Sequence, residues 1–141
     1  MNIFAFIAGI FIALIIISRF NKVGVQNDSG HFPVLLATFP LYYWAFAIYA
    51  KDEAALLIEI FVGVLFIAIA WLAHTLNRPK SLILLAVGFI GHGVYDVFHL
   101  AIYSHSVAPN WWPEFCGSID VLLGAYVLWL AKINHFQKKT A

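Results

Sequence analysis

Three residues able to bind a metal or move a proton share one face of the apolar segment 81–103. These residues are His92, Asp96 and His99. At about 100° per residue along a helix, Asp96 lies about 40° to one side of His92 and His99 about 20° to the other, and Tyr103 continues the stripe. A carboxylate and an imidazole at positions i and i+3 are a spacing with which helical bundles bind metal ions. The pattern therefore predicts that Asp96 and His99 are core metal ligands.

His92 stands too far along the same helix to join that pair. At 1.5 Å per residue, His92 and His99 are about 10.5 Å apart, so the two imidazoles do not share one metal ion. We expect His92 to act as a second ligand group or as a proton relay. A neutral, hydrogen-bonded core histidine is the alternative.

The composition indicates whether such a helix lies in water or in a membrane. Of the 141 residues, 63% are hydrophobic and 11% are charged, whereas a soluble domain has about 25% charged residues. Five apolar stretches are long enough, or nearly so, to cross a membrane, and they cover residues 2–18, 32–50, 54–76, 81–103 and 115–133. We therefore predict an all-α integral membrane protein, a five-helix bundle in a single transmembrane domain, 1–141, with a kink at Pro40 in the second span.

The basic residues predict the orientation of the bundle. Of the eight lysines and arginines, only Lys51 falls on one side. The other seven share the opposite side and are Arg19, Lys22, Arg78, Lys80, Lys132, Lys138 and Lys139. Because basic residues favour the cytoplasmic side, we expect the N-terminus outside and the C-terminus in the cytoplasm. A bacterial inner membrane is the expected location.

This orientation brings further polar residues to the depth of Asp96 and His99. Glu59 lies just below the outer end of the third span, and Asp120 lies near the outer start of the fifth. Ionisable residues inside a membrane usually face a protein interior and indicate function. We therefore predict a metal site in the outer half of the membrane, with Glu59, Asp96, His99 and Asp120 as ligands.

Two residues of the outer loop region, His105 and Glu114, are secondary candidates that we expect to cover this site. Each main ligand also has a structural alternative. Asp120 would stabilise the start of its helix through the helix dipole, and Glu59 would pair with Lys51. Asp96 and His99 would form an interhelical hydrogen-bonded pair that fixes helix register.

Carboxylate and imidazole ligands favour zinc, iron or manganese and disfavour a soft-metal thiolate site. Such a metal suits an enzyme that activates water or oxygen against a lipid or another apolar molecule. Two alternatives stay open: a proton-coupled or ion-coupled transporter, and a structural or ligand-binding subunit without catalysis. Homo-oligomerisation is a further open alternative.

The single cysteine, Cys116, excludes an internal disulfide and a two-cysteine thiol relay. We expect Cys116 to be a packing residue, with a ligand role left open by its closeness to Asp120. The sequence has no cluster of basic residues of the kind that binds nucleic-acid phosphates, so a nucleic-acid partner is not expected. The lipid bilayer is the expected partner.

Overall fold

The computed structural model describes residues 2–24, 30–102 and 106–140, and these residues form helices and connecting turns without strands. The helices are α1 (Ile3–Val23), α2 (His31–Thr38), α3 (Pro40–Ala50), α4 (Glu53–Thr75), α5 (Arg78–Ile102) and α6 (Trp112–Thr140). α2 and α3 together make one apolar span, His31–Ala50. The prediction of five helices long and apolar enough to cross a membrane is therefore confirmed.

Local side-chain and backbone chemistry sets the helix ends. Asn2 and Asp52 precede α1 and α4, and each side chain accepts a hydrogen bond from the backbone three residues later. Gly24 ends α1 in the left-handed conformation, with φ of 76°, which glycine adopts without steric cost. Pro40 lacks the N–H that would continue α2, and the break at Phe39 confirms the expected interruption of this span.

The apolar helices extend beyond the boundaries predicted from hydropathy. α1 continues to Val23 rather than residue 18, and α6 runs from Trp112 to Thr140 rather than 115–133. Both extensions carry polar residues, and helical hydrogen bonds form without regard to hydropathy. Hydropathy therefore locates the apolar centre of each span better than its ends.

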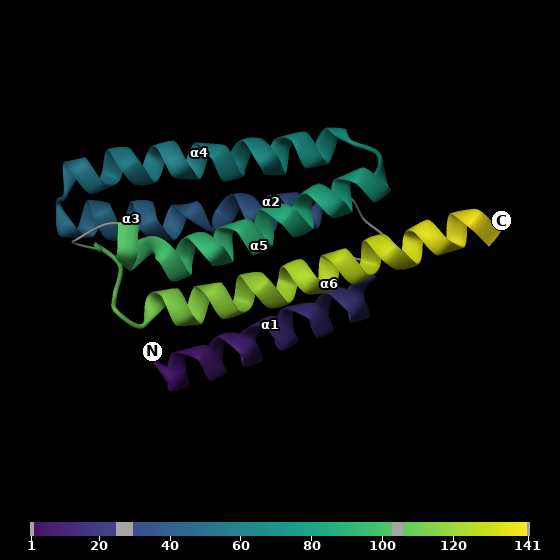
Figure 1. Cartoon of the computed structure of the whole chain (residues 1–141), viewed down its shortest axis with the longest axis horizontal. Coiled ribbons are helices and arrows are strands. Elements are labelled where there is room, and N and C mark those ends of the chain that lie inside the picture. The colour runs from purple at the N-terminus through teal and green to yellow at the C-terminus, as the bar shows by residue number, and fades with distance from the viewer. Residues whose placement is uncertain (1, 25–29, 103–105, 141) are drawn as a thin grey trace.

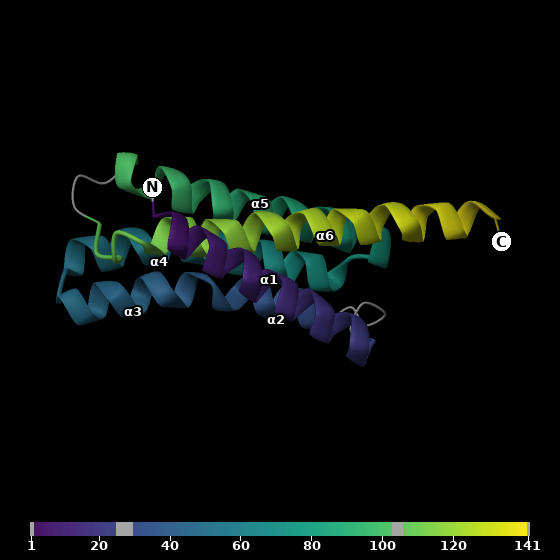
Figure 2. The same cartoon turned by 90° about the horizontal axis from the view of Figure 1, so that it is seen from below.

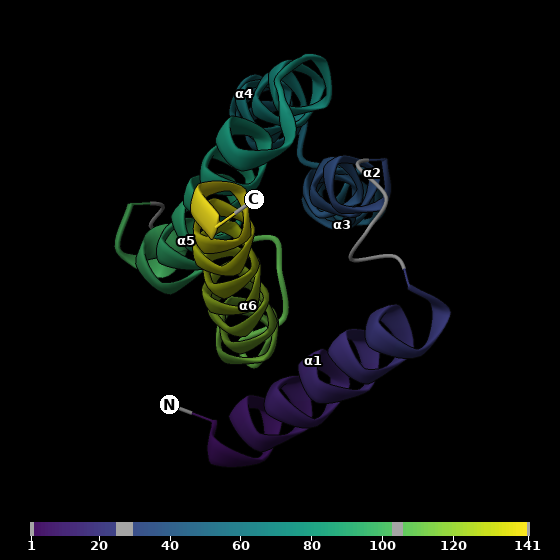
Figure 3. The same ribbon diagram turned by 90° about the vertical axis from the view of Figure 1, so that its right-hand side faces the viewer.

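The helices pack in a continuous series. α1 contacts α6, α6 contacts α5, α5 contacts α4, and α4 contacts α2 and α3. Figure 1 and Figure 3 show α4 and α1 on opposite sides of the α5–α6 pair. The N-terminus, the α3–α4 turn and the start of α6 lie at one end, and the C-terminal part of α6 extends past the bundle at the other (Figures 1 and 2).

Glycines let three of these helices approach closely. A Cβ atom on Gly9 of α1 would lie 2.0 Å from the Ser118 hydroxyl of α6. A Cβ on Gly93 of α5 would lie 3.0 Å from the Asp120 Cβ, and one on Gly124 of α6 would lie 3.2 Å from the Ala86 carbonyl oxygen. Larger side chains at these positions would push the helices apart.

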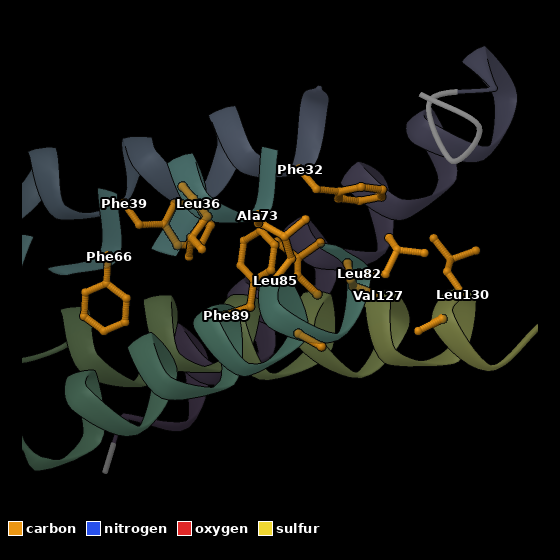
Figure 4. Close-up of a cluster of buried hydrophobic side chains, with 14 of the residues drawn as sticks. Phe32, Leu36, Phe39, Phe66, Ala73, Leu82, Leu85, Phe89, Val127 and Leu130 are labelled. Atoms are coloured by element: carbon orange, nitrogen blue, oxygen red, sulfur yellow. The ribbon is translucent and has the colours of Figure 1, made fainter. Parts of the chain in front are cut away.

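A buried apolar cluster fills the half of the bundle nearer the C-terminal end of α6. It draws on the late part of α4 and α6 and the early part of α2 and α5, as Figure 4 shows for residues that include Phe32, Ala73, Leu82, Leu85 and Val127. The buried ionisable residues Glu59, His92, Asp96, His99 and Asp120 belong to the other half, and Ser81 is a buried polar residue at the apolar end. The interior is therefore apolar at one end and polar at the other.

The outward faces of the helices carry many large apolar side chains. Phe4 and Phe11 on α1 and Leu57, Phe61 and Trp71 on α4 are all exposed, Phe4 by 82% and Phe61 by 81%. So many exposed large apolar side chains are unusual on a soluble monomer and are compatible with helices that cross a membrane.

Replacing Gly124 with valine tests the close packing of α5 and α6. We expect Gly124→Val to lower the free energy of unfolding by about 1 to 3 kcal/mol, because the branched side chain overlaps Ile90 and the Ala86 carbonyl. The measurement is thermal or denaturant unfolding in detergent. Ala125→Val, at the exposed neighbouring position, is the control, and equal stability of the two variants would contradict close packing.

Candidate functional site

The contact between α5 and α6 brings together two pairs of residues, each spaced one helical turn apart. α5 contributes His92 and Asp96, and α6 contributes Cys116 and Asp120. Residues at positions i and i+4 lie on the same helix face. Gly93 and Gly117 lie at the crossing: a Cβ on Gly117 would be 3.3 Å from the Gly93 carbonyl oxygen and 3.7 Å from the Asp96 Cβ. We call these four facing residues the His92 cluster.

The His92 imidazole lies at the centre of this cluster. Its Nδ1 atom is 2.7 Å from Oδ2 of Asp120, and the imidazole N–H donates a hydrogen bond to that carboxylate. The same Nδ1 is 3.6 Å from Oδ2 of Asp96, beyond ordinary hydrogen-bond distance. Cys116 Sγ is 4.0 Å from Asp120 Oδ2. One ligand atom from each residue lies within 4.8 Å of the others.

The two carboxylates are fully buried, and each has an oxygen without a hydrogen-bond donor. Asp96 and Asp120 are both 0% exposed. Oδ2 of Asp96 and Oδ1 of Asp120 make no hydrogen bond. A buried carboxylate is costly unless it is paired or bound to a metal. One imidazole supplies at most one positive charge to two carboxylates, so the site suits either a further cation or a proton held between the two carboxyl groups.

Tyr43 of α3 supports Asp96 from outside the cluster. Its hydroxyl donates a 2.8 Å hydrogen bond to Asp96 Oδ1, and the tyrosine is 1% exposed. Asp96 Oδ2 is thereby left on the side of His92. Such an outer hydrogen bond orients a metal-binding carboxylate.

A second polar cluster connects α4 to α5, and we call it the Glu59 cluster. His99 Nε2 lies 2.6 Å from Glu59 Oε1, and the Tyr95 hydroxyl donates to Glu59 Oε2 at 2.9 Å. Trp44 Nε1 donates to the Glu59 backbone carbonyl at 2.8 Å. Gly63 makes room for that indole: a Cβ there would lie 2.8 Å from two of its ring atoms.

Tyr43 also connects the two clusters. Its ring centroid is 4.6 Å from that of His99 and 6.4 Å from that of His92. Phe39 and Phe66 contact the His92 ring edge-on, at centroid distances of 5.6 and 4.8 Å. These two phenylalanines belong to the apolar cluster, so that cluster reaches the His92 ring directly.

The four ligands expected from the sequence are divided between the clusters. Asp120 and Asp96 face each other with His92, whereas Glu59 and His99 pair with one another on the α4 side. Three residues of helix rotate a side chain by about 300°, so Asp96 and His99 lie about 60° apart on α5 and face different neighbouring helices. The position of a residue along its helix axis therefore predicts which layer of the bundle it occupies. The rotation of the helix about that axis determines which residues it contacts.

Two structural alternatives are wrong. Asp120 is not at a helix start, because α6 begins at Trp112 and Asp120 lies two turns further along. Glu59 pairs with His99 and Tyr95 rather than with Lys51, which ends α3 in the left-handed conformation. Both carboxylates belong to interhelical contacts.

Of the secondary candidates, His92 lies in the His92 cluster, whereas Glu114 lies outside both clusters. Glu114 Oε1 accepts a 3.0 Å hydrogen bond from the backbone N–H of Asn2, which joins the starts of α1 and α6. Tyr103 and His105 lie outside the described residues. Cys116 joins the His92 cluster, and its spacing of four residues from Asp120 is the sequence signal for that position.

A groove lies beside the His92 cluster between α1, α5 and α6. It has a volume of about 560 Å³, within the range of small-molecule sites. Its walls are mostly apolar and include Phe6, Ile10, Val97, Gly117 and Leu122, with Glu114 and Ser118 as polar members. Val97 is 62% exposed, so the groove opens sideways from the bundle. Gly117 lines this groove, and a Cβ added to it would lie 3.7 Å from the Asp96 Cβ.

Removing the Tyr43 hydroxyl tests the support of Asp96. We expect Tyr43→Phe to lower the free energy of unfolding by about 1 to 3 kcal/mol, because a buried carboxylate oxygen loses its donor. Unfolding in detergent measures the effect. Tyr42→Phe, at the neighbouring half-exposed tyrosine, is the control. A Tyr43→Phe protein as stable as this control would show that the hydrogen bond contributes nothing.

Comparison of the chain with protein-family models, with curated proteins and with solved structures finds no match. What the two clusters can do therefore follows from their own geometry and side-chain chemistry.

Proposed function

We propose that this protein is a five-span integral membrane protein with its N-terminus outside and its C-terminus in the cytoplasm. Support comes from five helices of sufficient length and apolarity, from their apolar outward faces and from the seven-to-one distribution of basic residues. A bacterial inner membrane fits this distribution. In this orientation both polar clusters lie in the outer half of the membrane.

We further propose that the protein binds a divalent transition metal through His92, Asp96 and Asp120. The observation that carries this proposal is the His92 cluster itself: buried ligand atoms from two helices that lie within 4.8 Å of one another. Tetrahedral zinc holds its ligands about 3.3 to 3.8 Å apart. The most distant of these ligand atoms would have to approach one another by about 1.5 Å. His92 Nδ1 and Asp120 Oδ2, which are 2.7 Å apart, would have to separate by about 0.6 Å. Iron and manganese are compatible with the same nitrogen and oxygen donors.

The function we propose is metal-dependent chemistry on a lipid or another apolar substrate. A bound metal of this class supplies Lewis acidity and an activated water. The groove beside Gly117 offers an apolar molecule a lateral approach to the same layer of the bundle. The Glu59–His99 pair provides a second buried acid and base in this layer. Together these features favour an enzyme over a purely structural subunit.

A proton or ion pathway has less support. The two clusters form a nearly continuous polar series through Tyr43, which is what a relay requires. The other half of the described interior is filled by the apolar cluster, and no ionisable side chain is buried there among the described residues. This arrangement favours a site that is open to one side over a path across the membrane.

Topology reporters test the proposed orientation. We expect alkaline phosphatase fused after Lys51 to be active and phosphatase fused at the C-terminus to be inactive, because the enzyme folds only outside the cytoplasm. A fusion at Asn77, on the same predicted side as the C-terminus, serves as the matched control and is also expected to be inactive. High activity of the C-terminal fusion would contradict the orientation.

Metal analysis of the purified protein tests the proposed centre. We expect wild-type protein to retain a stoichiometric transition metal and His92→Ala to lose it, while His99→Ala, in the Glu59 cluster, retains it. Elemental analysis after size-exclusion chromatography provides the measurement and shows that each variant is folded. Folded wild-type protein that takes up no zinc, iron or manganese would overturn the proposal. Loss of metal in His99→Ala alone would instead favour the Glu59 cluster as the site.

A further inference from the structure

We propose that Cys116 is the fourth ligand of this metal, as a thiolate, and that the centre therefore prefers zinc and similar thiophilic ions over manganese. This inference rests on the proposed metal centre and identifies its metal class. It replaces the expected packing role of Cys116 with the ligand role that the sequence leaves open. A cobalt titration distinguishes a metal centre without a Cys116 ligand from the absence of a metal centre.

The position of Cys116 supports this role. The residue lies one helical turn before Asp120 on α6, so both side chains face α5. Cys116 is 5% exposed, and its Sγ lies within the same 4.8 Å group as the other three ligand atoms. Zinc–sulfur bonds are about 2.3 Å long and zinc–nitrogen and zinc–oxygen bonds about 2.0 to 2.2 Å. Cys116 Sγ is 4.0 Å from Asp120 Oδ2, which is close to the distance between two ligand atoms around one zinc ion.

The unpaired carboxylate oxygens provide a second, independent indication. Asp96 Oδ2 and Asp120 Oδ1 are buried without donors, while Asp120 Oδ2 faces both the imidazole and the thiol. An ordinary buried carboxylate would have hydrogen-bond donors for these oxygens. A metal ion between the four side chains would be bound by carboxylate oxygens as ligands. It would replace the hydrogen bond between His92 Nδ1 and Asp120.

The charge balance limits the kind of ion. Two carboxylates, one thiolate and a neutral imidazole around a divalent cation carry one net negative charge. The Tyr43 hydroxyl, which donates to Asp96, offsets part of it. Binding converts the thiol to a thiolate and releases its proton. The hydrogen on His92 Nδ1 has to move to Nε2, so that the neutral imidazole binds the metal through Nδ1. Soft thiolate ligands favour zinc, whereas manganese favours oxygen ligands.

The alternative is that Cys116 only fills space. Cys116 does pack with Tyr43, Ala108 and Trp112, and a small packing residue would suit that position equally well. A packing residue, however, leaves no spectroscopic mark on a bound metal. With one cysteine in the chain, any thiolate–metal signal comes from Cys116.

Thiolate ligation also affects the proposed chemistry. Four protein ligands complete a tetrahedral zinc site, whereas a catalytic zinc keeps one position open for water. The proposed chemistry therefore requires one of the four ligands to leave the metal when water or substrate binds. Cys116 would then limit access to the metal as well as its identity.

Titration of the full-length, detergent-purified protein with cobalt(II) provides the test, because cobalt replaces zinc and absorbs light. We expect a near-ultraviolet thiolate-to-cobalt charge-transfer band with the wild-type protein, together with displacement of cobalt by zinc. We expect the band to be lost in Cys116→Ser while visible cobalt bands show that the metal still binds. Cys116→Ala is the second variant, should serine disturb packing, and His74→Ala, at an exposed histidine of α4, is the control.

The outcomes of this titration distinguish the role of Cys116 from the existence of the metal centre. Cobalt binding with the charge-transfer band confirms the thiolate ligand, and the wild-type spectrum alone is sufficient for this. Cobalt binding without the band overturns the role of Cys116 and leaves the His92, Asp96 and Asp120 centre standing. Folded wild-type protein that binds neither cobalt nor zinc overturns the centre and, with it, this inference.

Discussion

The close approach of α5 and α6 is the constraint on which the polar interior depends. Gly93, Gly117 and Gly124 leave so little space between the two helices that an added Cβ meets backbone or side-chain atoms of the partner helix. In a membrane, where lipid tails are as apolar as leucine, such packing replaces the hydrophobic effect as the force between helices. The same contact places one face of α5 directly opposite one face of α6. Larger residues at the crossing would separate His92 from Asp120, and the cluster would lose its geometry.

The division of the bundle into two halves explains how buried charges are tolerated. In one half, side chains such as Phe32, Leu85 and Val127 pack without polar atoms. In the other, most polar groups are satisfied by a partner on another helix: Asp120 by His92, Asp96 by Tyr43, and Glu59 by His99 and Tyr95. A buried ionised pair is costly to assemble and more costly to break. Concentrating these groups in one layer favours a local function there over passage across the membrane.

Much of this arrangement can be predicted from the amino-acid sequence alone. Hydropathy predicts the five apolar helices, Pro40 predicts the break in the second, and counting residues from the helix ends places Glu59, Asp96, His99 and Asp120 in a common layer. The pairing within that layer does not follow, because it depends on the rotation of each helix about its own axis. That rotation is set by glycines and aromatic residues such as Gly93 and Tyr43, whose neighbours appear only in three dimensions. For this reason Asp96 and His99, one turn apart on α5, face different partners. The place of Cys116 in the His92 cluster, which the sequence leaves open, also depends on this rotation.

Crystals of the protein grown with zinc, and measured by anomalous diffraction on either side of the zinc absorption edge, would locate the metal directly. A metal centre built by the α5–α6 contact predicts one strong anomalous peak within bonding distance of His92 Nδ1 and of carboxylate oxygens from Asp96 and Asp120. No peak inside the bundle, or a peak between Glu59 and His99, would contradict the account.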